Sequence, residues 1–286
     1  MKLVRIGLPG AEKPALVDHA GKLRSLQDHV EDITVGELDR IAACDVDSLP
    51  LVEGHPRFGI PVAGIGKVVA IGLNYRDHAI ESNLPIPTEP VMFMKAISSL
   101  TGPHDFVMLP QGSTATDWEV ELGVVIGARA RYVSHADALG HIAGYVLVND
   151  VSERFNQKER GSQWSKGKGH DTFCPVGPWL VTPDEIADPM ALDMWLDVNG
   201  VRMQTGNTRT MIFNLAEIIS YVSRFVTLEP GDLVITGTPP GVGEGKRPDA
   251  IFLKAGDVME LGITGLGTQR QDVVAFDLQR LEGHDA

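Results

Sequence analysis

Short segments rich in Val and Ile outnumber helical patterns in this sequence, and the two kinds do not alternate along the chain. The strongest strand candidates are 118–126 and 142–149, and a hairpin with Asn199-Gly200 at its turn is expected within 192–203. The one clear amphipathic helix spans 213–225. A strand-dominated α+β fold, a mixed roll or sandwich, is therefore expected rather than a doubly wound parallel sheet.

The remaining elements follow from local patterns. Asn214 with Glu217 three positions later predicts a capped start for the long helix, and Thr34 with Glu37 predicts the same for a short helix over 34–43. A helical turn is expected around 75–82. Further strands are expected at 2–7, 67–72, 91–95, 232–236, 257–263 and 271–278, with a hairpin over 15–26 around Asp18-His19-Ala20-Gly21.

The length of 286 residues allows one large domain, or a large domain with a small one. Residues 45–66 mix Pro, Gly and polar residues without a clear period, so a boundary is expected near residue 63. This predicts a small N-terminal α/β domain over 1–63 and a main domain over 64–286.

The net charge limits which classes of partner the protein is expected to bind. Lys and Arg number 25 against 38 Asp and Glu, a formal net charge of −13. Such an acidic chain argues against nucleic acid and anionic membrane surfaces, although a cleft with local cations could still bind an anionic substrate. The sequence has two cysteines, Cys44 and Cys174, neither in a CxxC pair, and its start lacks the apolar core of a signal peptide. A reducing cytoplasm is therefore the expected location.

Two carboxylates stand two positions apart in Glu119-Val120-Glu121, and the expected strand continues as the apolar run 122–126. Residues two apart on a strand share a face, so both acids would point the same way. An isolated pair of this kind is usually a solvated strand face. A pair on a strand that enters the core would need a cation or a shared proton, and all-oxygen ligands suit Mg²⁺, Mn²⁺ or Ca²⁺. Asp150, at the end of strand 142–149, is either a helix cap or a third acid for this group.

His78 and Glu81 are three residues apart and would share one face of a helical turn. A carboxylate bonded to one imidazole nitrogen fixes the tautomer and leaves the other nitrogen as a base. The same spacing also fits a simple surface pair. Elsewhere, the glycine-rich segment 237–243 follows a strand, but its prolines and the lack of a GK[ST] sequence argue against a Walker loop.

Several motifs in a fixed order together resemble the fumarylacetoacetate hydrolase family over about residues 65–278. The matching segments are Gly72-Leu73-Asn74-Tyr75 with His78 and Glu81, Glu89-Pro90-Val91 to Lys95, Trp118 to Gly123, Asn149 to Ser152 with Arg154 and Gln157, Lys168 before Cys174-Pro175, and Thr236 to Gly243.

The resemblance implies a strand-rich roll, a homodimer and one Mg²⁺ or Mn²⁺ held by Glu119, Glu121 and Asp150. It implies that Glu81 orients His78 on a segment that closes over the substrate. Lys168 would act in catalysis. The residues expected to hold the substrate's carboxylate and other oxygens are Arg154, Gln157, Lys168 and Thr238.

The implied substrate is a small anionic 2-keto acid, and the implied reaction is hydrolysis of the C3–C4 bond of a 2,4-diketo-3-deoxy sugar acid to pyruvate and a second acid such as lactate. The same metal site would also suit oxaloacetate decarboxylation, acylpyruvate hydrolysis or isomerisation, or ureidoglycolate cleavage. Outside catalysis, the alternatives are a binding or sensor protein and a structural calcium site. Residues that distinguish substituents beyond C4 are expected in segments 76–90 and 152–167.

Overall fold

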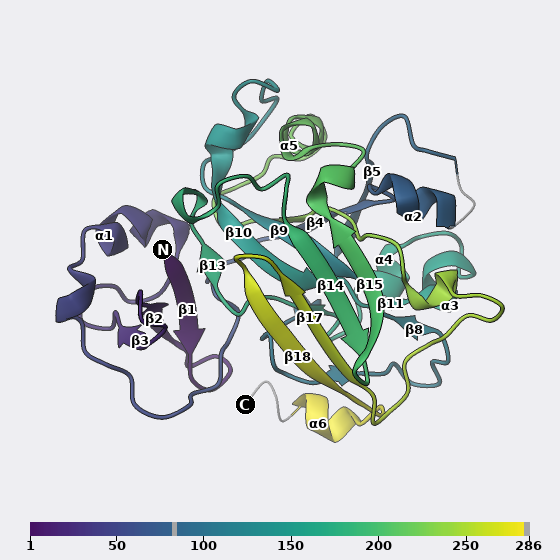
Figure 1. Ribbon diagram of the computed structural model, residues 1–286, viewed down its shortest axis with the longest axis horizontal. Coiled ribbons are helices and arrows are strands. Elements are labelled where there is room, and N and C mark those ends of the chain that lie inside the picture. Colours follow the sequence, from purple (N-terminus) through teal and green to yellow (C-terminus); the bar gives the residue numbers. More distant parts are fainter. Residues whose placement is uncertain (82–84, 283–286) are drawn as a thin grey trace.

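Two β-sheets pack face to face in the computed structural model, which describes residues 1–81 and 85–282 (Figure 1). The larger sheet has the order β3-β2-β1-β13-β10-β9-β16-β4-β5, and the smaller has the order β15-β14-β17-β18-β7. This strand-dominated arrangement of mixed sheets confirms the expected fold class.

The strands of the larger sheet are β1 (Lys2–Ile6), β2 (Lys13–Val17), β3 (Leu23–Ser25), β4 (Val68–Gly72), β5 (Val91–Lys95), β9 (Val120–Ile126), β10 (Ile142–Asn149), β13 (Leu180–Val181) and β16 (Leu233–Ile235). Those of the smaller sheet are β7 (Val107–Met108), β14 (Asp193–Val198), β15 (Val201–Asn207), β17 (Val258–Ile263) and β18 (Gly267–Val274). Two short pairs are β8 (Thr116–Asp117) with β11 (Ser152–Glu153), and β6 (Leu100–Thr101) with β12 (Cys174–Pro175).

Short helices and 3-10 turns fill the connections. The α-helices are α1 (Leu38–Ala42), α2 (Arg76–Glu81), α3 (Arg154–Lys158), α4 (Ser165–Lys168), α5 (Leu215–Val222) and α6 (Leu278–Glu282). The 3-10 turns are η1 (Val35–Glu37), η2 (Val46–Ser48), η3 (Ile97–Ser99), η4 (Ala138–His141), η5 (Pro183–Glu185), η6 (Thr208–Thr210) and η7 (Gly243–Gly245). None of the described helices is long and apolar enough to cross a membrane.

Alternation along β9 decides which face of the large sheet carries chemistry. Leu122 and Val124 belong to the core between the two sheets, together with Leu196 and Leu261 of the smaller sheet. Because strand side chains alternate, Glu121 and Val125 point to the opposite face. Val125 packs there in a second apolar cluster. The acidic side chains therefore lie outside the inter-sheet core, at the end of the second face.

The N-terminal segment extends the large sheet. Strand β1 pairs antiparallel with β13, Leu3 opposite Leu180. Leu3, Leu26 and Ile33 join the second apolar cluster beside residues of β10 and β16. In Figure 1 this purple segment lies at one end of the molecule and α2, α3 and α4 lie at the other. The division into 1–63 and 64–286 remains a prediction, because the sheet itself continues across it.

Most expected elements are present, and the differences have local causes. Helix α5 carries the predicted capping box, with Asn214 N–H donating to Glu217 Oε2 at 2.7 Å and Glu217 N–H donating to Asn214 Oδ1 at 3.0 Å. The Thr34 prediction is wrong: its side chain makes no capping hydrogen bond, because a 3-10 turn precedes α1. The last long strand begins at Gly267, earlier than expected, since Gly265 and Gly267 adopt positive φ angles of 82° and 88° in a tight turn. Residue 82 of the expected turn 75–82 lies outside the described residues.

Candidate active site

Three buried carboxylates meet where β9 and β10 lie side by side. Glu119 and Glu121 are 6% and 1% exposed, and Asp150 is 1% exposed. Antiparallel pairing places Val120 opposite Asn149, and Asp150 N–H donates to Glu119 C=O at 2.9 Å. One carboxylate oxygen from each of the three lies within 4.8 Å of the others. The local alternation and this pairing together build the acidic cluster that the sequence suggested.

Two buried ammonium groups border the cluster. Lys168 Nζ lies 2.9 Å from Glu119 Oε2 and 2.6 Å from Asp150 Oδ2, and Lys95 Nζ lies 2.6 Å from Asp150 Oδ1. Burial by itself lowers the pKa of Lys168, but Asp150 and Glu119 raise it above its ordinary value, so the ammonium stays charged. Three carboxylates thus face two lysines.

Glu121 is the carboxylate without a cationic partner among the described residues. Its Oε2 accepts the Gly237 N–H at 2.7 Å. Burial, Asp150 and Glu119 all raise the pKa of Glu121 well above its ordinary value. A divalent cation would supply the missing positive charge, and carboxylate oxygens are the ligands that hard cations prefer. The donor set therefore fits Mg²⁺ or Mn²⁺.

Arg154, the first residue of α3, lies against the cluster. Its Nη1 is 2.8 Å from Glu119 Oε1 and donates to Gln157 Oε1 at 3.1 Å, while its Nε donates to Asp117 Oδ2 at 2.8 Å. Burial disfavours the charge, yet Asp117 and Glu119 raise the pKa of Arg154. Glu153 fixes the helix start, because its side chain accepts the Asn156 N–H at 2.5 Å. The local fold thus holds this guanidinium in the site.

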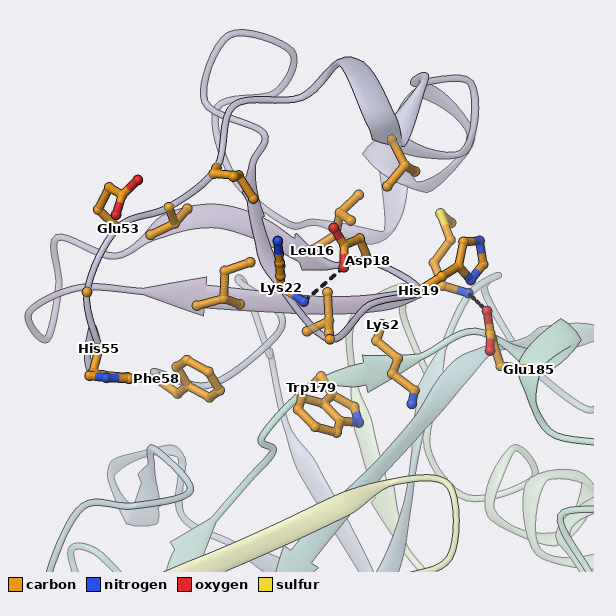
Figure 2. A pocket seen from close by; sticks show the side chains of 18 residues that line it. Lys2, Leu16, Asp18, His19, Lys22, Glu53, His55, Phe58, Trp179 and Glu185 are labelled. Atoms are coloured by element: carbon orange, nitrogen blue, oxygen red, sulfur yellow. Dashed lines mark hydrogen bonds and ion pairs between the residues drawn. The ribbon is translucent and has the colours of Figure 1, made fainter.

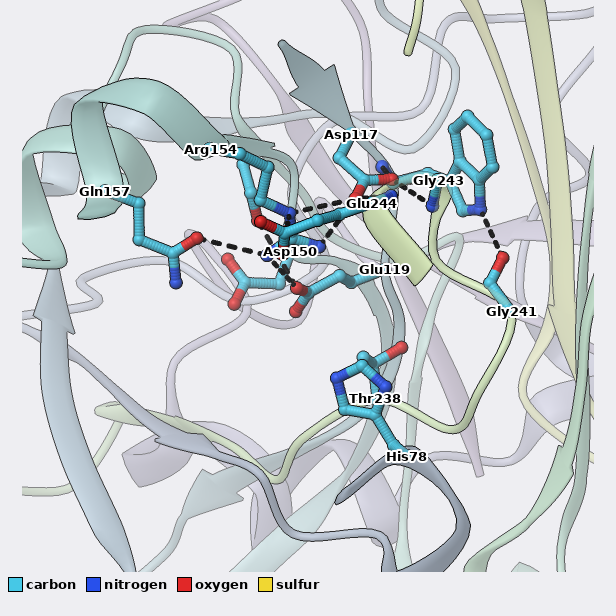
Figure 3. A network of polar contacts seen from close by, with 12 residues as sticks. His78, Asp117, Glu119, Asp150, Arg154, Gln157, Thr238, Gly241, Gly243 and Glu244 are labelled. Carbon is cyan, nitrogen blue, oxygen red and sulfur yellow. Dashed lines mark hydrogen bonds and ion pairs between the residues drawn. The ribbon is translucent and has the colours of Figure 1, made fainter. Parts of the chain in front are cut away.

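His78 and Glu81 share one face of α2, and His78 points into the same cavity as the acids (Figure 3). Nδ1 of His78 lies 3.4 Å from Glu81 Oε2. Glu81 also accepts the Gly241 N–H, at 3.0 and 3.1 Å to its two oxygens. Burial raises the pKa of Glu81, but His78 and the Gly241 N–H lower it below its ordinary value. An ionised Glu81 thus orients the imidazole.

The hydroxyl group of Thr238 is fixed by two hydrogen bonds within the protein. Its hydroxyl donates to Val120 C=O at 2.9 Å and accepts from Gln204 Nε2 at 2.8 Å. Gln204, fully buried, also accepts the Val120 N–H at 2.9 Å. With its proton committed to Val120, this hydroxyl can only accept a further hydrogen bond.

The structure brings the sequence-predicted residues together. His78, Glu119, Glu121, Asp150, Arg154, Gln157, Lys168 and Thr238 all line one cavity, and Glu81 contacts it through His78. Sequence reasoning missed Asp117 and Gln204, which bond Arg154 and Thr238, and it did not single out Lys158 and Glu244, which also line the cavity. Asp117 directly precedes a matched motif and could have been noticed. Lys95 lies in a quoted motif but was given no role.

A second, larger cavity of about 810 Å³ lies between the N-terminal segment and Trp179 (Figure 2). Two of its carboxylates are engaged locally: Asp18 pairs with Arg24 at 2.8 Å, and Glu185 pairs with the Met1 amino group at 3.2 Å. The acidic cluster and His78 do not line it. The candidate active site is therefore the smaller cavity, of about 50 Å³.

Several known proteins resemble this chain. Residues 67–274 match the family described as fumarylacetoacetate hydrolase C-terminal. A 2,4-didehydro-3-deoxy-L-rhamnonate hydrolase of Sphingomonas sp. strain SKA58 is 71% identical over 96% of both chains. The fumarylacetoacetate hydrolase structure from psychrophilic Exiguobacterium antarcticum is 34% identical with a TM-score of 0.85, covering 96% of this chain and 100% of that one. A 2-hydroxyhepta-2,4-diene-1,7-dioate isomerase from Mycobacterium marinum is 34% identical with a TM-score of 0.75, covering 96% and 98%.

Proposed function

The chain belongs to the fumarylacetoacetate hydrolase family of enzymes, and we propose that it hydrolyses the C3–C4 bond of a 2,4-diketo-3-deoxy sugar acid. The observation that carries this proposal is the shared cavity of the Glu81-oriented His78 and the three buried carboxylates. A base for water beside a cation site is what cleavage of a 2,4-diketo acid needs. The relative named as a 2,4-didehydro-3-deoxy-L-rhamnonate hydrolase supports that substrate.

The proposed cofactor is Mg²⁺ or Mn²⁺, held by Glu119, Glu121 and Asp150. Glu121 supports this choice, because this buried carboxyl has no cationic partner among the described residues and a cation would favour its charged form. When bound, the ion supplies Lewis-acid stabilisation of negative charge on the oxygens of a 2-keto acid.

His78 acts as the general base. Glu81 bonds the Nδ1 side of the ring, which leaves Nε2 free to take a proton from water. The water oxygen then forms a bond to C4, and the C3–C4 bond breaks. Its electron pair stays on the three-carbon fragment as pyruvate enolate, which takes up one proton at C3. The C4 fragment leaves as a carboxylic acid, lactate when the substrate is the rhamnonate derivative.

Fixed positive groups hold the substrate oxygens in this scheme. Lys168 and Arg154 are buried cations whose charge is secured by neighbouring acids, so they need no reorganisation when negative charge develops. Gln157 is bonded to Arg154 and presents its amide to the cavity. Thr238, as an acceptor, would contact a hydroxyl or water rather than a carboxylate.

A pyruvate-release assay on 2,4-diketo-3-deoxy-L-rhamnonate, with Mg²⁺ or with EDTA, tests the proposal. We expect pyruvate and lactate in equal amounts with the metal and neither after chelation. Release of pyruvate from oxaloacetate alone would favour a decarboxylase, and pyruvate from simple acylpyruvates alone would favour an acylpyruvate hydrolase. Glyoxylate from ureidoglycolate would favour the lyase.

A homodimer is proposed on the same resemblance. Analytical ultracentrifugation would give about twice the chain mass of 30.9 kDa if it is correct.

A further inference from the structure

Lys158 and Glu244 form an ion pair at the cavity, with Nζ and Oε2 2.5 Å apart. Lys158 ends α3 and Glu244 lies in η7, so the pair joins two segments that both line the cavity. Neither side chain has a task in the reaction described above. Lys158 falls within segment 152–167, where substrate-reading residues were expected, whereas Glu244 lies outside both expected segments. Residues 82–84 of the other segment lie outside the described residues.

Glu244 is held in place from its backbone. Its N–H donates to Asp117 Oδ2 at 3.0 Å, and the preceding Gly243 N–H donates to Asp117 Oδ1 at 2.7 Å. A Cβ at Gly243 would come within 1.9 Å of Ile251 C=O, so the chain can pass there only as glycine. The backbone that carries Glu244 is therefore fixed at the cavity wall, and the ion pair with Lys158 holds its carboxylate there.

The pair occupies the outer end of the cavity. Arg154 meets Glu119 through Nη1 at 2.8 Å, and its Nε is 3.8 Å from Glu244 on another edge of the guanidinium (Figure 3). Side-chain exposure rises along this row, from 7% at Glu119 to 34% at Glu244 and 41% at Lys158. A substrate whose keto-acid end lies at the buried carboxylates would point its tail toward the pair.

The charges of the pair cancel. Lys158 is the cation at the outer end, and Glu244 neutralises it. A second carboxylate on the substrate would therefore find no unpaired Lys or Arg among the described residues that line the cavity, and it would face Glu244 itself. A hydroxyl group meets no such repulsion, because it can donate to the carboxylate or accept from the ammonium.

We propose that the Lys158–Glu244 pair selects substrates with an uncharged, hydroxyl-bearing tail and rejects those with a tail carboxylate. This inference rests on the proposed function and specifies its substrate class.

The test compares three 2,4-diketo acids that differ only beyond C4. They are 2,4-diketo-3-deoxy-L-rhamnonate with a hydroxyl, 2,4-dioxoheptanedioate with a carboxylate, and 2,4-dioxopentanoate with a bare methyl group as the reference. For the Glu244→Gln variant, kcat/KM on the carboxylate-tailed acid should rise about tenfold or more relative to the reference, because Lys158 becomes available to it. The kcat/KM on the hydroxyl-tailed acid should fall relative to the reference.

Two further variants test the same pair in the opposite direction and provide a control. Lys158→Gln, at an exposed helix end, should lower the relative rate on the carboxylate-tailed acid, the opposite direction. Lys166→Gln is the matched control, since this exposed lysine of α4 bonds Arg160 C=O at 2.7 Å and does not line the cavity. If both variants of the pair still release pyruvate and keep the parent's relative kcat/KM values on the three acids, this inference is wrong while the proposed function stands. No pyruvate from any of the three acids would overturn the proposed function and this inference with it.

Discussion

Asp117 holds the guanidinium of Arg154: Oδ2 of the carboxylate lies 2.8 Å from both Nε and Nη2. The same carboxylate accepts the backbone N–H groups of Gly243 and Glu244 at 2.7 and 3.0 Å. Asp117 is fully buried. One side chain therefore positions both the arginine of the site and the loop segment Gly243-Glu244 at the cavity.

Replacing Asp117 by Asn should weaken substrate binding. The variant keeps an oxygen acceptor but loses the charge that holds Arg154, an effect of about 1.5–3 kcal/mol for a hydrogen bond to a charged group. We expect KM to rise by about tenfold or more and kcat to fall less. Steady-state kinetics check this, with Asp28→Asn, an exposed carboxylate, as the control. An unchanged KM would remove Asp117 from the positioning of Arg154.

Glu121→Gln should separate metal binding from folding. Glu121 is buried beside two like charges that raise its pKa, so a neutral amide should leave the metal-free protein as stable as the parent, or more so. The same change removes one metal ligand. Thermal melting with and without Mg²⁺ should therefore show an undiminished Tm without metal and a loss of the metal-induced rise. A lowered Tm in the metal-free protein would contradict this reading of the cluster.

His78→Ala should abolish most turnover while leaving metal binding intact. General-base catalysis typically contributes about 10²–10⁴-fold to the rate. Metal binding should persist because His78 does not belong to the group of three carboxylates that could hold the ion. Glu81→Gln should have a smaller effect in the same direction, because the ring remains but loses its ionised partner. Pyruvate release and isothermal titration with Mn²⁺ measure the two properties separately. Full turnover in His78→Ala would exclude it as the base.

The cap of α5 offers a test of stability away from the site. Asn214→Ala removes the side chain that accepts the Glu217 N–H at 3.0 Å and should cost about 1 kcal/mol. Thr34→Ala is the matched control, since Thr34 makes no capping bond and should change stability little. Urea unfolding of the two variants compares them directly. Equal losses would mean that the α5 cap contributes nothing.

The stability of the fold around the N-terminal segment should depend on pH through the ion pair of Arg57 and Asp105. Its Nη2 and Oδ2 atoms are 2.5 Å apart. Burial raises the pKa of Asp105, but Arg57 outweighs it and lowers the pKa below the ordinary 3.8. A carboxyl with a lowered folded-state pKa stabilises the fold above the unfolded pKa, and this is lost as pH falls through the folded value. Asp105→Asn should therefore cost about 1–3 kcal/mol at neutral pH, and less as pH falls below 3.8. A difference that stays constant with pH would contradict this.

Local patterns predicted what depends on neighbours in sequence. The shared face of Glu119 and Glu121 follows from the two-residue period of a strand, and the Asn214 cap follows from a four-residue motif. The convergence of Asp150 with these acids needed the pairing of β9 with β10, which no local pattern predicts. Local reasoning left Asp150 as either a cap or a third acid, and the family resemblance favoured the second.

Long-range contacts lay beyond such patterns. Lys158 and Glu244 are 86 positions apart, and Gln204 and Thr238 are 34 apart, and no local period links either pair. The strands of the N-terminal segment were predicted, but their addition to the large sheet was not, because edge pairing with β13 leaves no mark in the sequence of either strand.

The bond from the Gly241 N–H to Glu81 joins α2 to the glycine-rich loop, 160 positions away in the sequence. The carboxylate that is proposed to orient His78 is therefore itself held from this loop. With His78 as the proposed base, a substitution in the loop that breaks this bond would lower turnover without touching any carboxylate of the acidic cluster.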